Sequence, residues 1–393
     1  MTLDRRSFIK VLGSASGLAL AGCAAQGPVG STTEIMPKGA TRRVVVVGGG
    51  FGGAIAAKYI RMLDKSIEVV LVEQNRQFIS CPFSNFYIAG LMNDMSTLTI
   101  GYDKLAANHG IKMVYGVATA IDPAAKKVVT TEGTLTYDRL IVSPGIDFRN
   151  EEVEGYTADS ANTIPHAWKA GAQSTLLRNQ LQAMPDGGKV IISMPLVPYR
   201  CPPGPYERSS LIANYLKKHK PKSKVILLDA NADVVAKKPL FMKAWSTYYK
   251  GIFEYIPGKK VTAVDVANRT LLVEGIEEFK GDVVNFIPPQ RAAAIAAKAG
   301  LVGEDKKWCP VNVTTFESTL QKNIHVIGDS AIAGAMPKSG YSANSQAKVC
   351  AINLVALMNG KELTELSGIN VCYSAISDHE SISVAGVYAV KEG

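Results

Sequence analysis

The sequence predicts an α/β fold with two domains built on parallel sheets, the second a degenerate version of the first type, and a small C-terminal segment. Two observations carry this prediction. A buried strand leads into a glycine-rich loop and a helix near residue 50, and a second strand–helix–strand unit lies near residue 200 without such a loop. The chain of 393 residues is long enough for two domains with a sizeable core.

The first element is a buried strand at residues 44–47, followed by a helix at 54–63 that turns small residues towards the sheet. The loop GGGFGG between them is typical of a Rossmann-like nucleotide-binding unit. Its glycines permit a tight turn, close approach of the backbone to a pyrophosphate and close packing of helix on strand. The loop residues that we assign to cofactor binding are Gly48, Gly50, Phe51 and Gly53.

The next strand, at 67–73, ends in Glu73, about twenty residues beyond the loop, where a carboxylate can accept a hydrogen bond from a ribose hydroxyl. Two later stretches indicate that the dinucleotide is FAD. YDRLIVSPG (137–145) gives an apolar strand and a turn with Pro144 and Gly145. NIHVIGDSA (323–331) gives a strand that leads to Asp329, whose carboxylate is placed to hold the ribityl chain.

The second α/β unit contains the expected helices and strands 170–184, 188–194, 206–219 and 223–229. Its loop, PLVPYRCPPGPYE, is poor in N–H donors because proline has none, and only Gly204 allows close backbone approach. We therefore predict a second Rossmann-like, FAD/NAD(P)-binding type of domain that has lost NAD(P)H binding. It keeps Cys201 on a stiff loop before a helix N-terminus, which favours thiolate chemistry. The alternative is a rigid turn with an incidental cysteine.

The N-terminus predicts export. DRRSFIK (4–10) is a twin-arginine pattern, and the apolar stretch after it is too short to span a bilayer, so we expect a signal peptide and a periplasmic protein. LAGC (20–23) also resembles a lipoprotein cleavage box, so Cys23 is either a lipid anchor or removed with the signal. No transmembrane span and no metal site are expected.

The net charge of +9 comes without a dense basic block, which argues against nucleic-acid binding and leaves room for docking of an acidic protein partner.

Several motifs together resemble the flavoprotein subunit of flavocytochrome c sulfide dehydrogenase, a relative of sulfide:quinone oxidoreductases within the pyridine nucleotide-disulfide reductase-like flavoproteins. The resemblance runs from about Arg42 to the C-terminus. It rests on GGGFGG, SCPFSN, PHAWKAG, RCPPGPYER, IPPQRA, WCPV, IGDS, MPKSGYSANSQAK and NVCYS. It implies an FAD-dependent enzyme that oxidises hydrosulfide to sulfur or polysulfide through a redox-active disulfide and passes electrons singly to a c-type cytochrome. The chain has no Cys-x-x-Cys-His motif, so the haem would belong to the partner subunit.

The same resemblance implies residue roles. Cys81 is expected to bind FAD covalently through a thioether, with a free buried cysteine as the alternative. Cys201 and Cys372 are expected to form the catalytic disulfide. Cys350 competes with Cys372 for that role, although its neighbours read as a packed helix. Lys338 is expected to stabilise negative charge on the reduced flavin, unless it is a surface lysine.

We predict a signal peptide and spacer at 1–40, an FAD-binding domain at 41–155 and 285–360, a degenerate central domain at 156–284, and a C-terminal flavin or interface segment at 361–393. The family continues for some dozens of residues beyond this point, so the last segment is expected to be short or truncated.

Two other functions stay open. A sulfide:quinone oxidoreductase-like enzyme would dip amphipathic C-terminal helices into a membrane, whereas residues 371–393 alternate like strands. A non-catalytic flavoprotein accessory of a sulfur-oxidation system would keep every FAD motif.

Overall fold

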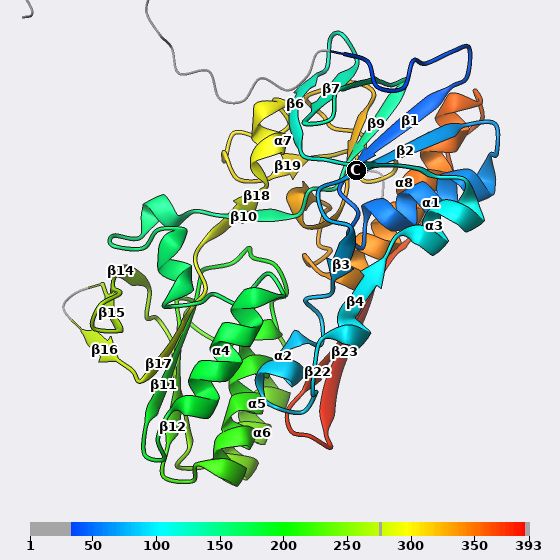
Figure 1. Ribbon diagram of the computed structural model, residues 1–393. Helices are drawn as coiled ribbons and strands as arrows, with labels where there is room; N and C mark the ends of the chain where they lie inside the picture. Colours follow the sequence, from blue (N-terminus) through cyan, green and yellow to red (C-terminus); the bar gives the residue numbers. More distant parts are fainter. Residues whose placement is uncertain (1–32, 275–276, 390–393) are drawn as a thin grey trace, which may run out of the picture.

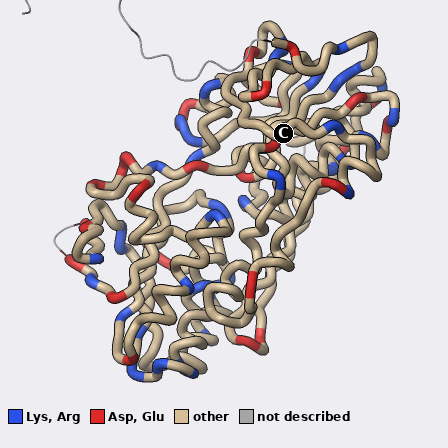
Figure 2. The backbone as a smooth tube through the Cα atoms, in the orientation of Figure 1, with Lys and Arg blue, Asp and Glu red and all other residues tan. Residues whose placement is uncertain are grey.

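The computed structural model describes residues 33–274 and 277–389, which form two α/β lobes with a long C-terminal hairpin beside both of them (Figure 1). The twin-arginine pattern and Cys23 lie outside the described residues. Lys and Arg alternate with Asp and Glu over the described surface, as Figure 2 shows.

The first lobe is built on a parallel sheet with the strand order β20-β9-β1-β2-β5. Its strands are β1 (Arg43–Val47), β2 (Glu68–Glu73), β5 (Lys112–Tyr115), β9 (Arg139–Val142) and β20 (Ile324–Val326). Every residue of β1 is buried, because α1 (Gly53–Leu63) and α8 (Gly340–Met358) pack on one face of the sheet. Over the other face lie β6 (Ala118–Asp122), β7 (Lys127–Thr130) and β8 (Thr134–Thr136) (Figure 1). The predicted strand–loop–helix–strand unit is confirmed to within one residue.

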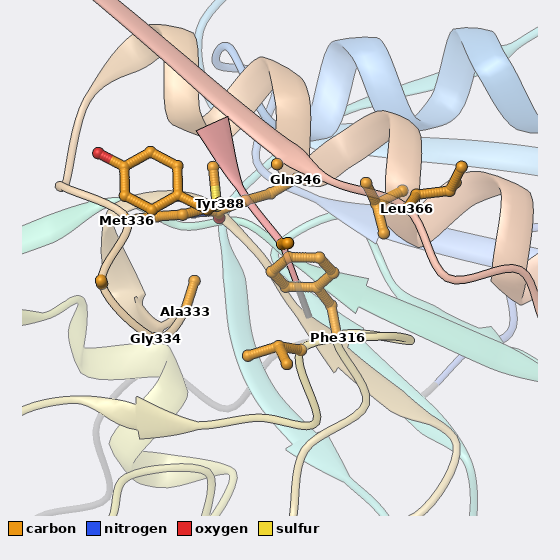
Figure 3. A pocket seen from close by; sticks show the side chains of 12 residues that line it. Phe316, Ala333, Gly334, Met336, Gln346, Leu366 and Tyr388 are labelled. Carbon is orange, nitrogen blue, oxygen red and sulfur yellow. The ribbon is translucent and has the colours of Figure 1, made fainter. Parts of the chain in front are cut away.

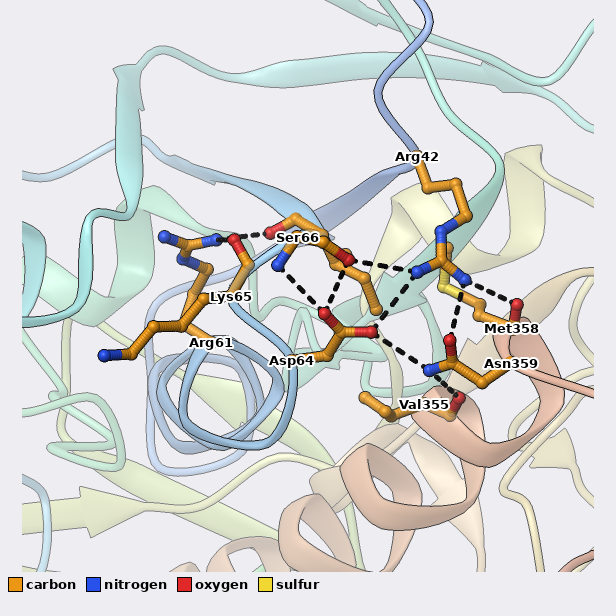
Figure 4. Close-up of polar contacts among 9 residues, drawn as sticks. Arg42, Arg61, Asp64, Lys65, Ser66, Val355, Met358 and Asn359 are labelled. Atoms are coloured by element: carbon orange, nitrogen blue, oxygen red, sulfur yellow. Dashed lines mark hydrogen bonds and ion pairs between the residues drawn. The ribbon is translucent and has the colours of Figure 1, made fainter. Parts of the chain in front are cut away.

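A polar network ties the ends of α1 and α8 to the start of this sheet (Figure 4). Arg42 donates to the carbonyl oxygen of Met358 at 2.6 Å and to the carboxylate of Asp64 at 3.2 Å. Hydrogen bonds from Ser66 and Asn359 lower the pKa of Asp64 to about 2, so its negative charge is retained at neutral pH. The network fixes the sheet at the edge opposite to the glycine loop.

The second lobe has a parallel sheet with the strand order β13-β12-β11-β17. Its main elements are α4 (Ala172–Ala183), β11 (Lys189–Met194), α5 (Gly204–His219), β12 (Lys224–Asp229), α6 (Lys238–Tyr248), β13 (Phe253–Ile256) and β17 (Val283–Phe286). The predicted helices and strands of this unit are confirmed. Helix α5 begins at Gly204, earlier than expected, because proline fits the first turn of a helix, where no N–H partner is needed.

Shorter elements connect the lobes and cover their edges. They are β3 (Gln77–Ile79), α2 (Ser84–Ile88), β4 (Thr99–Gly101), α3 (Asp103–His109), β6 (Ala118–Asp122), β7 (Lys127–Thr130), β8 (Thr134–Thr136), β10 (Ile146–Phe148), β14 (Val261–Asp265), β15 (Thr270–Val273), β16 (Glu278–Lys280), β18 (Gln290–Ala292), α7 (Ala294–Lys298), β19 (Cys309–Pro310) and β21 (Ala331–Ile332). The paired strands β10 and β18 pass between the two lobes (Figure 1).

The C-terminal hairpin pairs β22 (Gly368–Ala375) with β23 (Ser381–Tyr388) and contacts both lobes. Ser339, in front of α8, donates to Asn370 of the hairpin at 2.6 Å, and Tyr249, after α6, donates to the carbonyl oxygen of Ile376. The strand-like alternation that the sequence predicts here is confirmed. The expected domain boundaries remain a prediction, and β17 spans the one expected at residue 284.

Candidate active site

The glycine loop lies at the carboxyl edge of the first sheet, beside the turn that follows β9. A Cβ atom on Gly48 would stand 2.3 Å from the carbonyl oxygen of Ser143, and one on Gly53 would stand 1.8 Å from that of Gly48. A Cβ atom on Gly50 would meet only one neighbour within 4 Å, the Phe78 ring at 3.6 Å, which is an ordinary van der Waals contact. The loop therefore needs glycine for its own packing and leaves room for a ligand at the middle glycine.

Glu73 ends β2 next to this loop and accepts a hydrogen bond from the N–H of Gly49 at 2.7 Å. Phe51 packs edge-on against Phe78, with 5.3 Å between the ring centroids, and so braces the loop against β3. Beyond Glu73 lies an open hollow of about 650 Å³, in which the Arg76 guanidinium stacks on Tyr115. A hollow at the carboxyl ends of β2 and β5 is where a doubly wound sheet binds the far end of a dinucleotide.

Asp329 follows β20 at the same edge. Its Oδ1 atom is buried and has no hydrogen-bond partner among the described residues, and burial raises the pKa of its carboxyl group. The neighbouring Ser330 donates to the carbonyl oxygen of Gly145 at 2.5 Å, which ties this turn to the turn that contains Pro144. A buried carboxylate oxygen without a donor is suited to a ligand hydroxyl, so the residues present fit FAD.

Three cysteines gather where the two lobes and the hairpin meet. The Cys81 Sγ atom lies 3.4 Å from the carbonyl oxygen of Trp168 and 4.0 Å from the guanidinium of Arg200, the residue before Cys201. Glu207, six residues after Cys201, accepts a hydrogen bond at 2.9 Å from the N–H of Ala375, which ends the strand that carries Cys372. The segments that carry the predicted flavin-linking cysteine and the predicted disulfide partners therefore contact one another. All five described cysteines are free thiols.

The environment of Cys201 has opposing effects on its thiol. Burial raises the pKa of its thiol well above the usual value, and the charges of Glu207, Cys372 and Cys81 raise it further. The thiol is partly buried, and its position before the N-terminus of α5 acts in the opposite direction, so the expected thiolate chemistry stays a prediction. The backbone N–H of Cys201 donates to the carbonyl oxygen of Lys338 at 2.7 Å, which joins the thiol loop to the first lobe.

A buried guanidinium holds the walls of this thiol site together. Arg208 is 1 % exposed, stacks on Trp168 at 4.8 Å and donates to Asn85, Asn285 and the carbonyl oxygens of His166 and Ala167. Its neighbour Glu207 accepts from Asn85 at 2.7 Å. The sequence reasoning missed both residues, although their place directly after RCPPGPY was a signal that they belong to the thiol site.

Lys338 is partly buried and is not a free surface lysine. Its ammonium donates to the carbonyl oxygens of Asp329 at 2.8 Å and Ala331 at 2.9 Å, and lies 3.8 Å from the ring centroid of Trp308. Burial lowers its pKa to about 8. A cation at this place is suited to an anionic ligand, so its role beside the flavin stays a prediction.

Cys350 and Cys309 are completely buried in two different apolar clusters of the first lobe. Cys350 faces the core from α8, and burial raises the pKa of its thiol. The position of Cys350 agrees with the expectation that it lies in a packed helix.

In the second lobe, the acidic residue at the carboxyl end of the second strand is buried and hydrogen-bonded. Asp229 ends β12 as Glu73 ends β2, but its side chain is 0 % exposed. Its Oδ2 atom accepts hydrogen bonds from the hydroxyls of Tyr206 at 2.7 Å and Tyr255 at 3.0 Å. Asp229 occupies the position from which a carboxylate would bind a ribose hydroxyl, but it is hydrogen-bonded to two tyrosines inside the lobe. This arrangement supports the predicted loss of NAD(P)H binding.

An apolar cavity of about 140 Å³ lies between α8 and the end of β23 (Figure 3). Phe316, Met336, Leu366 and Tyr388 line it, with no cysteine and no charged side chain. It is separate from the thiol site.

Within residues 33–274 and 277–389, no cluster of three or more His, Cys, Asp or Glu side chains is arranged to hold a metal ion. No helix in the same ranges is both long and apolar enough to cross a membrane.

Comparison with known proteins places this geometry in a family. Residues 174–288 match the family model of the central part of the sulfide dehydrogenase [flavocytochrome c] flavoprotein chain, and residues 42–178 match that of pyridine nucleotide-disulphide oxidoreductases. The flavoprotein chain of sulfide dehydrogenase [flavocytochrome c] from Chlorobaculum thiosulfatiphilum is 69% identical over 45 residues, which cover 94% of that sequence and 12% of this chain. The chain belongs to this family of flavoprotein chains. It is therefore an FAD-binding oxidoreductase.

More distant relatives cover most of the chain. The mitochondrial sulfide:quinone oxidoreductase of Dictyostelium discoideum is 20% identical over 328 residues, 80% of this chain and 70% of the relative. The crystal structure of the sulfide:quinone oxidoreductase from Aquifex aeolicus superposes with a TM-score of 0.73 at 20% identity, over 88% of this chain and 87% of that one. At this identity the likeness shows the fold, and it confirms the predicted fold class.

Proposed function

We propose that this chain is the flavoprotein subunit of a sulfide dehydrogenase that oxidises hydrosulfide to sulfur or polysulfide and delivers electrons singly to a c-type cytochrome. Family membership supports sulfide oxidation by a flavoprotein. The observation that carries the finer proposal is the contact between the segments of Cys81, Cys201 and Cys372: Arg200 lies 4.0 Å from the Cys81 sulfur, and Glu207 of α5 is hydrogen-bonded to Ala375 of β22.

In the proposed reaction, Cys201 and Cys372 form a disulfide in the oxidised enzyme. Hydrosulfide attacks one sulfur, so the S–S bond breaks, a persulfide forms on the attacked cysteine and the other cysteine leaves as a thiolate. A second hydrosulfide attacks the outer sulfur of the persulfide and releases it as a disulfide dianion or its protonated form. Both cysteines are then reduced by two electrons in total. When bound, FAD supplies a two-electron acceptor that can release electrons one at a time.

We also propose that Cys81 holds FAD covalently. Its loop between β3 and α2 reaches the thiol site, and its sulfur lies 4.0 Å from Arg200. This position supports a bond to the flavin edge next to the disulfide.

The proposed cytochrome partner is supported by an apolar outer face on the hairpin. Ile369, Tyr373 and Val387 are 42%, 73% and 71% exposed, on the strand that carries Cys372 and on its neighbour. Exposed apolar residues so close to a redox site are suited to docking a protein. Periplasmic export by the twin-arginine route, with or without a lipid anchor at Cys23, completes the proposal and rests on the sequence alone.

The decisive experiment is stopped-flow mixing of the FAD-loaded protein with sulfide, with and without a c-type cytochrome. Cys201→Ser is expected to keep its yellow flavin and its reduction by dithionite, but to lose bleaching by sulfide. The control is Cys350→Ala, a change at a buried thiol in an apolar cluster that does not include Cys201, which is expected to bleach as the wild type does. Bleaching of Cys201→Ser at the wild-type rate would rule out the disulfide mechanism, and absence of cytochrome reduction in the wild type would rule out the proposed acceptor.

A further inference from the structure

Lys237 is a second-lobe residue whose side chain is bonded to the hairpin. It precedes α6 with a left-handed backbone, φ 56°, and its ammonium donates to the carbonyl oxygen of Cys372 at 2.8 Å. It also donates to the hydroxyl of Ser374 at 2.8 Å and to the carbonyl oxygen of Ile382 at 3.4 Å. All three acceptors belong to β22 and β23, so one cation joins both strands of the hairpin.

The ammonium lies on the face of β22 that carries the reactive sulfur. Side chains alternate along a strand, so Asn370, Cys372 and Ser374 project from the same face. The bond to the Ser374 hydroxyl places the charge on this face, and Asn370 approaches the Cys372 sulfur from the other side at 3.8 Å.

The nearby charged residues Glu207 and Arg208 are hydrogen-bonded to partners other than Lys237, so the ammonium of Lys237 can interact with the cysteine sulfurs. Burial lowers its pKa, and the charges of Cys372, Glu207 and Cys201 act in the opposite direction. Glu207 of α5 already accepts hydrogen bonds from Asn85 at 2.7 Å and from the N–H of Ala375 at 2.9 Å. Arg208, the residue after Glu207 on α5, uses its guanidinium on Asn85, Asn285 and backbone carbonyls.

We propose that Lys237 is a positioning residue that orients Cys372 and stabilises negative charge on its sulfur when the Cys201–Cys372 disulfide opens. This inference rests on the proposed disulfide chemistry. Attack of hydrosulfide on Cys201 leaves Cys372 as a thiolate, and attack on Cys372 leaves it as a persulfide, which loses its proton readily. In the first case the negative charge is on the Cys372 sulfur. In the second it is on the Cys201 thiolate and on the outer sulfur of the persulfide that Cys372 carries. Lys237 interacts electrostatically with both cysteines, and no further reactant is needed.

The test measures alkylation of Cys372 by iodoacetamide in the reduced full-length protein, quantified by peptide mass spectrometry at neutral pH. The thiolate is the nucleophile, so the rate reports the ionised fraction. Lys237→Gln keeps a donor for the hairpin carbonyls and removes the charge, and is expected to slow alkylation about five- to tenfold. Lys237→Arg is expected to restore the rate. Lys238→Gln, which removes the adjacent exposed cation paired with Asp233, is the matched control and is expected to change nothing.

Wild-type rates in Lys237→Gln, or failure of Lys237→Arg to restore them, would overturn the inference. If neither variant folds, wild-type alkylation in rising salt decides: slowing supports an acting charge, and a constant rate rejects it. The assay needs no sulfide turnover. The two proposals can therefore fail separately. If sulfide does not bleach the wild-type flavin but Lys237→Gln still slows alkylation of Cys372, the proposed function is rejected and the role of Lys237 is supported.

Discussion

His166 makes the protein sensitive to acid. Its ring is 7 % exposed, packs against Phe148 in a tilted arrangement with 4.1 Å between centroids, and accepts a hydrogen bond from the N–H of Trp168 at 2.9 Å. Burial, followed by the charges of Lys169, Arg208 and Arg200, lowers its pKa from 6.5 to about 3. The folded protein therefore keeps this histidine neutral across the weakly acidic range.

The size of the effect follows from this pKa difference. The unfolded chain binds a proton at this histidine below about pH 6.5, whereas the folded chain does so only below about pH 3. The stabilisation is therefore complete above pH 6.5 and is lost as the pH falls towards 3. At pH 5 the free energy of unfolding is lower by about 2 kcal/mol from this group.

The assay is urea unfolding at pH 8 and pH 5. His166→Asn retains a side-chain oxygen for the Trp168 N–H and cannot titrate, so its loss of stability between the two pH values is expected to be smaller by about 2 kcal/mol than that of the wild type. Buried His325 contributes to both proteins alike, since its pKa is also lowered by burial. His379→Asn, at a side chain 86% exposed, is the control. An identical pH dependence in wild type and His166→Asn would refute the reasoning.

Two further predictions concern the cofactor. Gly53→Val is expected to purify without FAD absorbance, because its Cβ would overlap the carbonyl oxygen of Gly48 at 1.8 Å; Gly39→Val, at a site with nothing within 4 Å, is expected to retain FAD. A yellow Gly53→Val protein would contradict the role assigned to this loop. Acid precipitation is expected to leave the colour in the wild-type pellet and to release it from Cys81→Ser, and a colourless wild-type pellet would reject the thioether.

The fold of the first lobe could be predicted because its sequence signals are local. The apolar run of β1, the glycines after it and the small residues of α1 each specify one piece of backbone, and they adjoin one another in the chain. Asp329 is distant in sequence, but a strand followed by Gly-Asp is itself a recognisable local pattern.

The charges around the thiols could not be predicted because they depend on tertiary contacts. Lys237 is one of two adjacent lysines, and only the docking of the hairpin distinguishes it from exposed Lys238. The surroundings of Cys201 depend on tertiary contacts in the same way, since the helix that follows its loop is visible in the sequence and the charges of Glu207 and Cys372 near its thiol are not.

The hydroxyls of Tyr206 and Tyr255 on Asp229 bear on attempts to engineer this scaffold. Replacing the prolines after β11 by glycines would restore a flexible, glycine-rich turn but would not create space for a nucleotide. Tyr206 is 0 % exposed, and its ring packs against Phe241 and Trp245. A redesign to bind pyridine nucleotides would have to replace some of these buried aromatic side chains by smaller ones. It would also have to provide new hydrogen-bond donors for the carboxylate of Asp229, which would lose those of Tyr206 and Tyr255. The aromatic residues that fill this part of the second lobe belong to its hydrophobic core, so removing them to make room for a nucleotide would destabilise the lobe.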